Sequence, residues 1–150
     1  MEKNFLPVSI DISGQKILII GGGQSALKKI NILKRFEADL EVVALKVCQE
    51  IKQSGVRFSE KEYDPGDLKG FLMVYSCSNN PELDKKIVDD CKKSGVLINI
   101  HDNPAMCQFI SPAIYKDGHM TVAVSSNGRD VFNSIRIRDL IQKFLQPEFY

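Results

Sequence analysis

A run of three glycines between an apolar segment and a helical pattern constrains this chain more than any other feature. Residues 16–20 read Lys-Ile-Leu-Ile-Ile and predict a strand that is buried on both faces of a sheet. Gly21, Gly22 and Gly23 follow at once, and with Ala26 they match the spacing G-x-G-x-x-A of the dinucleotide-binding fingerprint. We therefore expect a nucleotide pyrophosphate at the N-terminal end of the next helix. The alternative is a tight strand-to-helix turn without a ligand.

Composition narrows the class of protein. A chain of 150 residues with 43% hydrophobic residues is long enough for one domain with a real core, or one domain plus a small appendage. The formal net charge of +1 indicates no nucleic-acid partner, and the apolar runs are too short for a membrane span. The first residues lack the pattern of a secretory signal, so we expect a cytoplasmic protein. Reduced, structural thiols and no metal site are expected, because metal-ligand spacing is absent around Cys48, Cys77, Cys91 and Cys107.

Strands and helices alternate along most of the chain. The apolar periodicity predicts strands at 16–20, 39–44, 56–59, 71–77 and 96–100, and helices at 24–36, 47–53 and 81–93. In the first of these helices, Lys28 and Lys29 are predicted on the outer face. The alternation is typical of an α/β protein with a Rossmann-like, doubly wound parallel sheet, and we assign residues 1–108 to it as a dinucleotide-binding domain. A weakly alternating segment, 6–10, predicts a short edge strand ahead of the sheet.

The pattern changes after Pro104. Residues 109–115 and 119–124 predict an antiparallel hairpin, and residues 131–145 predict a helix. These elements, within 109–150, are too few to bury their own apolar face, so they must pack on the sheet or on a second copy of the chain. The Ile and Val content of both hairpin strands favours the second copy, and we predict a small α+β dimerisation segment.

Polar residues follow the predicted strands at the carboxyl edge of the sheet, where open α/β sheets bind ligands. Ser76 and Asn79 lie there, although an N-cap at Asn79 or Asn80 ahead of a helix is an equally good interpretation. Asp102 follows the strand 96–100 and is a candidate general base, with a plain turn as the alternative. His101 would point to the opposite face if that strand continued.

The position of the ribose is less clearly marked. An acidic residue often ends the second strand of such a fold and binds the ribose hydroxyls. Here Leu45 and Lys46 follow that strand, so backbone groups would have to hold the ribose. Lys46 could accept a 2′-phosphate, as in NADP, but a solvated lysine is the commoner case. In the last third of the chain, Arg129, Arg136 and Arg138 suit either an anionic ligand or a solvated helix face.

Five segments of the sequence together resemble a known family. In order, they are Leu6-Pro-Val, Ile19-Ile-Gly-Gly-Gly23, Asn99-Ile-His-Asp102, Phe109-Ile-Ser-Pro-Ala-Ile114 and Gly118-His-Met-Thr-Val-Ala-Val-Ser-Ser126. They resemble the precorrin-2 dehydrogenase domain of siroheme synthases over nearly the whole chain. The last two segments are the most specific, because many folds share the glycine loop.

The resemblance implies an enzyme that oxidises precorrin-2 to sirohydrochlorin with NAD, and a homodimer built through the segment after the sheet. In some members the same site then acts as a ferrochelatase (a lyase) and inserts Fe²⁺ to give siroheme. Asp102 matches the catalytic aspartate of the family, and Ser126 matches a serine at the tetrapyrrole site. Contacts with NAD are implied for Gln24, Ser25, Leu45 and Lys46.

Two departures from the family pattern leave an alternative open. Many members have Ser/Thr-Gly-Gly-x-Ser-Pro where this chain has residues 126–131, and Arg129 could add a contact to a substrate carboxylate there. We also expect the chain to lack the C-terminal helical segment that covers the site in longer members. The alternative function is a non-catalytic NAD- or tetrapyrrole-binding module.

Overall fold

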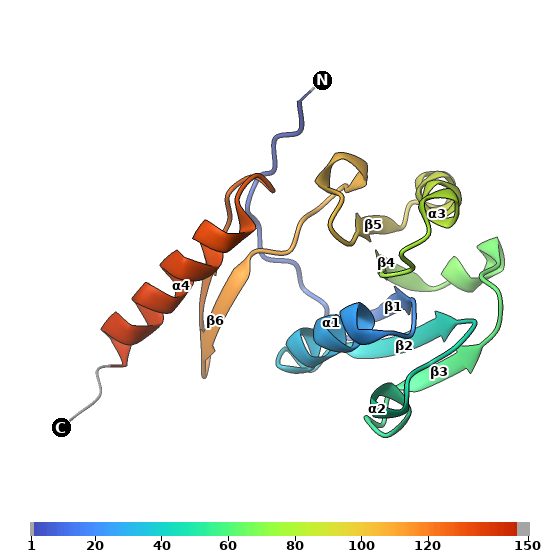
Figure 1. Ribbon diagram of the computed structural model, residues 1–150, viewed down its shortest axis with the longest axis horizontal. Helices are drawn as coiled ribbons and strands as arrows, with labels where there is room; N and C mark the ends of the chain where they lie inside the picture. The colour runs from blue at the N-terminus through green and yellow to red at the C-terminus, as the bar shows by residue number, and fades with distance from the viewer. Residues whose placement is uncertain (1, 147–150) are drawn as a thin grey trace. The chain divides into compact units, whose positions relative to one another are not determined.

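The computed structural model describes residues 2–146 (Figure 1). Five strands form one sheet in the order β3-β2-β1-β4-β5, and every pairing between neighbours is parallel. They are β1 (Lys16–Ile20), β2 (Asp39–Ala44), β3 (Arg57–Glu60), β4 (Phe71–Ser76) and β5 (Leu97–Ile100). The order reverses between β1 and β4, which is the point where doubly wound sheets bind ligands at the carboxyl edge. The predicted doubly wound parallel sheet is confirmed.

Helices connect the strands and cover the sheet. They are α1 (Gln24–Lys34), α2 (Gln49–Lys52) and α3 (Pro81–Ser94), with short 3₁₀ turns η1 (Pro65–Leu68) and η2 (Pro104–Met106). Alternate residues of the central strands, such as Ile17 and Ile19, share one buried cluster with Ile30 of α1 and Ile51 of α2. The helix α3 buries Ile87, Val88 and Cys91 and packs against β5.

The chain divides into two compact units: residues 9–109 form the first, and residues 2–8 with 110–146 form the second. In the second unit, β6 (Ala113–Asp117) and β7 (Met120–Val124) form an antiparallel hairpin, and α4 (Val131–Leu145) packs against both strands. The predicted hairpin and helix are present, although the first hairpin strand begins four residues later than expected. The membership of residues 2–8 in this unit was not foreseen in the sequence.

The predicted edge strand at residues 6–10 is wrong. Residues 2–12 contain no strand, and the side chains of Leu6 and Val8 are 82% and 67% exposed. Pro7 has no N–H to donate to a ladder, and an alternating pattern does not form a strand without a partner edge. The second predicted helix is also shorter than expected, because α2 spans only Gln49–Lys52. Among residues 2–146, no helix is both long enough and apolar enough to cross a bilayer.

Candidate functional site

Gly21 makes the turn out of β1 between the two neighbouring strands. Its φ of +122° lies in the range that L side chains rarely adopt, and a β-carbon there would collide with the backbone carbonyl of Cys77. Its N–H donates to the Val43 carbonyl at 2.9 Å, while the Cys77 N–H donates to the Ile20 carbonyl at 2.7 Å. The first glycine of the motif is therefore locked at the centre of the sheet edge, as its predicted role in a sharp turn requires.

Gly22 packs on the segment that follows β2. A β-carbon on Gly22 would collide with the Lys46 carbonyl and lie 2.8 Å from the Val47 Cα. The Cys48 N–H donates to the Gly22 carbonyl at 2.8 Å. The middle glycine, for which the motif specifies no residue type, is thus required here by a contact between two loops that are distant in the sequence.

The surroundings of Gly23 and Ala26 differ: open space at the first and close packing at the second. A β-carbon on Gly23 would meet nothing within 4 Å, so this glycine leaves open space above the backbone instead of filling a packing contact. Gly23 is the N-cap of α1, no side chain caps the helix, and no acidic residue lies in its first turn. Ala26 is fully buried in the core. The uncapped N–H groups and open approach fit the pyrophosphate of a dinucleotide.

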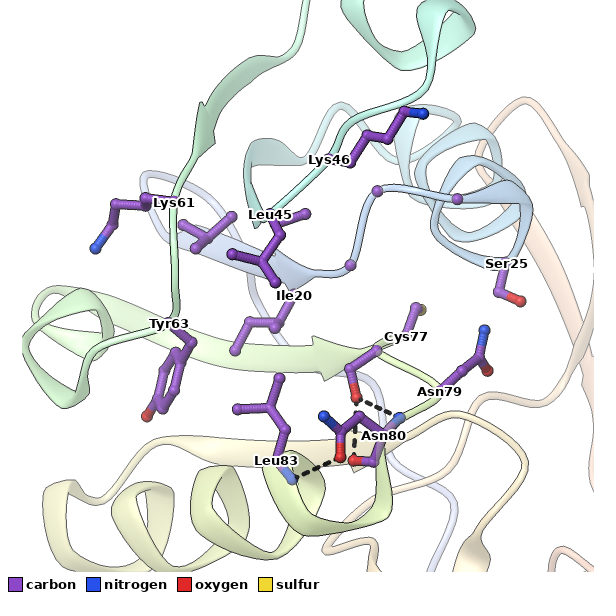
Figure 2. Close-up of a pocket in the computed structure, with 16 residues that line it drawn as sticks. Ile20, Ser25, Leu45, Lys46, Lys61, Tyr63, Cys77, Asn79, Asn80 and Leu83 are labelled. Carbon is purple, nitrogen blue, oxygen red and sulfur yellow. Dashed lines mark hydrogen bonds between the residues drawn. The ribbon is translucent and has the colours of Figure 1, made fainter.

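The glycine loop forms one wall of a pocket of about 280 Å³ (Figure 2). This pocket brings together seven of the predicted cofactor residues: Gly21, Gly22, Gly23, Ser25, Leu45, Lys46 and Asn79. The other two predicted residues, Gln24 and Ser76, do not line it. The sequence interpretation missed further lining residues, among them Ile20, Lys61, Tyr63 and Leu83. These residues come from β1, the loop after β3 and α3, which are brought together only by the tertiary structure.

Tyr63 gives the pocket a fixed apolar wall. Its side chain is 9% exposed, its hydroxyl donates to Asp90 Oδ2 at 3.0 Å, and Lys86 Nζ lies 5.5 Å from the ring centroid. Burial, and then the hydrogen bond to the Asp90 carboxylate, raise the pKa of Tyr63 well above its usual value. Tyr63 therefore stays neutral. With Ile20 and Leu83 nearby (Figure 2), the wall suits a flat ring such as adenine.

Hydrogen bonds at the end of β4 and in the loop that follows stabilise the opposite side of the pocket. The hydroxyls of Ser76 and Ser78 both donate to Asp84 Oδ1, at 2.7 and 2.8 Å. Asn80 is the N-cap of α3, and its Oδ1 accepts from the N–H groups of Glu82 and Leu83, as one of the two sequence interpretations held. Ser76 is buried and supports this loop, so its direct contact with NAD stays a prediction.

None of the described residues that line the pocket is acidic. Glu60, at the end of β3, instead braces the segment after β2: its Oε2 accepts from the Val47 N–H at 3.1 Å, and its Oε1 pairs with Lys52 at 2.8 Å. These two interactions, with that of Lys52 the larger, lower the pKa of Glu60. Contact between the ribose and backbone groups stays a prediction.

Asp102 lies just beyond the carboxyl end of β5, which ends at Ile100. The His101 N–H still donates to the Ser76 carbonyl at 2.9 Å, but Asp102 has a φ of +58° and leaves the strand direction. His101 Nε2 therefore lies 3.2 Å from Asp102 Oδ2, and the opposite-face placement, which required a continuing strand, does not occur. The Asp102 side chain is 86% exposed, so its carboxylate can reach a ligand.

In the second unit, the residues that depart from the family pattern form a loop that hydrogen bonds hold together. Asn127 takes a φ of +60°, and its side chain bonds the Phe5 N–H at 2.7 Å and the Lys3 carbonyl at 3.0 Å. Ser126 Oγ accepts from the Asp130 N–H at 2.8 Å, and Arg129 pairs with Glu2. Asp130 caps α4 in turn. The roles of Ser126 and Arg129 toward a tetrapyrrole stay predictions.

One prediction about α1 is wrong. Lys28 is exposed, as expected for the outer face, but Lys29 is half-buried and its Nζ lies 4.8 Å from the Tyr75 ring centroid. The long, flexible stem lets the side chain fold back over the sheet edge, which helical periodicity cannot predict.

The amino-acid sequence is similar to those of siroheme synthases. That of Buchnera aphidicola is 35% identical over 129 residues, and that of Azotobacter vinelandii is 32% identical over 129 residues. Each alignment covers 83% of this chain, and 27% and 28% of the respective relative. The chain thus spans between a quarter and a third of the length of these relatives. The resemblance read from the five sequence segments is confirmed.

A solved structure titled SirC, precorrin-2 dehydrogenase, has the same fold. It superposes with a TM-score of 0.79 at 23% identity and covers 93% of this chain and 70% of its own. Residues 8–113 match the family model described as putative NAD(P)-binding. The match includes the whole glycine loop and pocket, and the chain belongs to this putative NAD(P)-binding family.

Proposed function

We propose that this protein is a precorrin-2 dehydrogenase, which oxidises precorrin-2 to sirohydrochlorin with NAD⁺ in siroheme biosynthesis, in the cytoplasm. The observation that carries the proposal is that Asp102 and the glycine-loop pocket lie at the same carboxyl edge of one sheet, in a chain similar to siroheme synthases. A nucleotide site alone would fit many reactions. An exposed carboxylate beside it adds a group that can act on a bound substrate.

The pocket residues account for cofactor binding. The N-terminal end of α1 and the open backbone at Gly23 would hold the pyrophosphate, and the wall formed by Ile20, Tyr63 and Leu83 would hold the adenine. When bound, NAD⁺ supplies the hydride acceptor. We place the nicotinamide toward the loop after β4, where Asn79 lines the pocket.

Asp102 handles the proton in this mechanism. Oxidation of precorrin-2 removes one hydride and one proton, so a carboxylate beside the reacting edge can accept that proton or hold a pyrrole N–H in place. The exposed side chain and the nearby His101, which could pass a proton onward, suit that role. For Ser126 and Arg129, contact with the substrate carboxylates stays a prediction.

Anaerobic turnover tests the proposal. Precorrin-2 and NAD⁺ are mixed with the protein, and NADH and sirohydrochlorin are followed by absorbance, with Asp102→Asn as the matched variant. Turnover by the wild type and a loss of about 100-fold or more in the variant would support the enzyme. If the wild type binds NAD⁺ without turnover, the chain is a binding module instead. Addition of Fe²⁺ after dehydrogenation then tests ferrochelatase activity.

We further propose a homodimer through the second unit. Several large apolar side chains on α4 are exposed, with Phe132 at 87% and Phe144 at 83%. Side chains of this size rarely cluster on the surface of a monomer. Sedimentation equilibrium is expected to give a dimer for the wild type and a monomer for the double variant Phe132→Glu, Phe144→Glu. A monomeric wild type at micromolar concentration would refute the dimer.

A further inference from the structure

Lys29 brings a positive charge to the sheet edge where Asp102 lies. Its ammonium sits over the ring of Tyr75, a buried residue of β4, and that ring makes an edge-to-face contact with Phe109 at 5.3 Å between centroids. The Lys29 side chain is thus held against the sheet by a fixed aromatic pair. Its neighbour Lys28, one residue earlier on the same helix, is exposed.

The surroundings of Lys29 include the candidate catalytic group. Burial lowers the pKa of Lys29, while the negative charges that Cys77, Cys107 and Asp102 can carry act in the opposite direction. Tyr75, under the ammonium, pairs with Asn99 of β5, three residues before Asp102, so Lys29 lies near the sheet edge that carries Asp102. Partial burial of an ammonium carries a desolvation penalty that is smaller for an exposed lysine such as Lys28.

The charge of Asp102 by itself poses a problem for the proposed function. Precorrin-2 is rich in carboxylates, and an exposed aspartate at the reacting edge repels such a polyanion. A cation fixed beside the aspartate offsets that repulsion and offers a partner to one substrate carboxylate. Lys29 is not among the residues that line the nucleotide pocket, so this role is separate from NAD binding.

We propose that Lys29 is a substrate-binding residue, whose ammonium pairs with a carboxylate of the tetrapyrrole beside Asp102. This inference rests on the proposed function. It adds a residue from α1 to the substrate site for which the resemblance implied Asp102.

Equilibrium binding of sirohydrochlorin, followed by its absorbance, tests the role of Lys29 without turnover. The variants are Lys29→Met, which keeps the length and apolar stem, Lys29→Arg, which keeps the charge, and Lys28→Met as the control on the same helix. We expect Lys29→Met to weaken tetrapyrrole binding at least tenfold and to reduce its dependence on salt. Lys29→Arg should stay within about threefold of the wild type and Lys28→Met within twofold. The Kd for NADH should change less than twofold in all three.

Each other outcome has a definite meaning. If Lys29→Met binds sirohydrochlorin as tightly as the wild type, the inference is wrong and Lys29 does not contact the tetrapyrrole. If Lys29→Met loses NADH and tetrapyrrole binding together with a lower melting temperature, while Lys29→Arg also loses tetrapyrrole binding, the role is structural and the inference is again wrong. If the wild type itself binds no tetrapyrrole, the proposed function fails as well.

Discussion

The N–H of Cys48 donates a 2.8 Å hydrogen bond to the carbonyl of Gly22, which ties the glycine loop to the segment after β2. The same two segments approach so closely that Gly22 has no room for a β-carbon. One wall of the nucleotide pocket therefore depends on a backbone contact between residues that lie 26 positions apart. This contact and three other local arrangements lead to testable predictions.

Gly22→Ala is expected to destabilise the protein and to abolish tight nucleotide binding. The added β-carbon would collide with the Lys46 carbonyl and lie 2.8 Å from the Val47 Cα, and both are backbone atoms that cannot rotate away. Overpacking of this kind costs about 1–3 kcal/mol. Urea denaturation measures the loss of stability, and NADH fluorescence titration measures the Kd.

Gly23→Ala is the matched control for that variant. Its β-carbon would enter open space and its φ is −98°, so the free energy of unfolding should change by less than about 1 kcal/mol. Nucleotide binding should nevertheless weaken, because the methyl group occupies the approach of the pyrophosphate. Equal stability losses in the two variants would contradict the packing account of Gly22, and unchanged NADH binding by Gly23→Ala would contradict the proposed phosphate position.

Two variants of Tyr63 distinguish the role of its ring in the pocket wall from the role of its hydroxyl in a hydrogen bond. Tyr63→Phe keeps the ring but removes the donor to Asp90 Oδ2, so stability should fall by about 1–2 kcal/mol while the Kd for NADH changes less than twofold. Tyr63→Ala removes the wall itself and should weaken NADH binding about tenfold. Isothermal titration calorimetry with NADH and with adenosine monophosphate would locate the loss. A Tyr63→Ala variant with wild-type affinity for both would place the adenine elsewhere.

Asn127 is expected to anchor the N-terminal residues. Asn127→Gly keeps the left-handed backbone but removes both hydrogen bonds, to the Lys3 carbonyl and the Phe5 N–H. Hydrogen exchange followed by mass spectrometry should therefore accelerate in the peptide that contains residues 3–5. The strands of the first unit should keep their wild-type exchange rates. Unchanged exchange at residues 3–5 would mean that other contacts hold this segment.

Cys91 is expected to make the free energy of unfolding depend on pH in the alkaline range. Burial, and then the charge of Asp90, raise the pKa of the Cys91 thiol from 9.0 to about 12 in the folded chain. Above pH 9 the unfolded chain ionises this thiol while the folded chain does not, so the free energy of unfolding falls as pH rises from 9 toward 12. Below pH 9 the contribution is fully present. Denaturation curves between pH 8 and pH 11 should show a shallower decline for Cys91→Ala than for the wild type, and parallel declines would refute the assignment.

Local sequence was sufficient for the parts of this fold that depend on neighbours along the chain. The run Ile17–Ile20 predicts a buried central strand, and the spacing Gly21-x-Gly23-x-x-Ala26 predicts the turn and helix behind it. The N-cap at Asn80 before Pro81 is another local signal, since a short side chain bonds N–H groups two and three residues ahead. The prediction of a strand at residues 6–10 was wrong, because an alternating pattern forms a strand only when a neighbouring strand pairs with it.

Only part of the candidate site could be predicted from the sequence, because the other part depends on contacts between distant segments. Gly21, Gly23 and Asp102 follow predicted strands, so the common carboxyl edge of a parallel sheet places them together. Tyr63 and Leu83 lie in connections whose paths are set by long-range packing, and no local pattern marks them as pocket walls. Helical periodicity, for the same reason, put Lys29 in solvent, although its flexible stem reaches back over Tyr75.

The sequence by itself determined the order of strands and helices, the glycine turn after β1 and the placement of Asp102 at the sheet edge. These features depend on backbone propensities and on spacing within one strand-turn-helix unit. Only the tertiary structure decided that Gly22 must lack a side chain, that Tyr63 walls the pocket and that Lys29 shares an edge with Asp102. Those relationships join residues that are distant in the chain. Close packing and charge in three dimensions determine these relationships, and a pattern along the sequence does not indicate them.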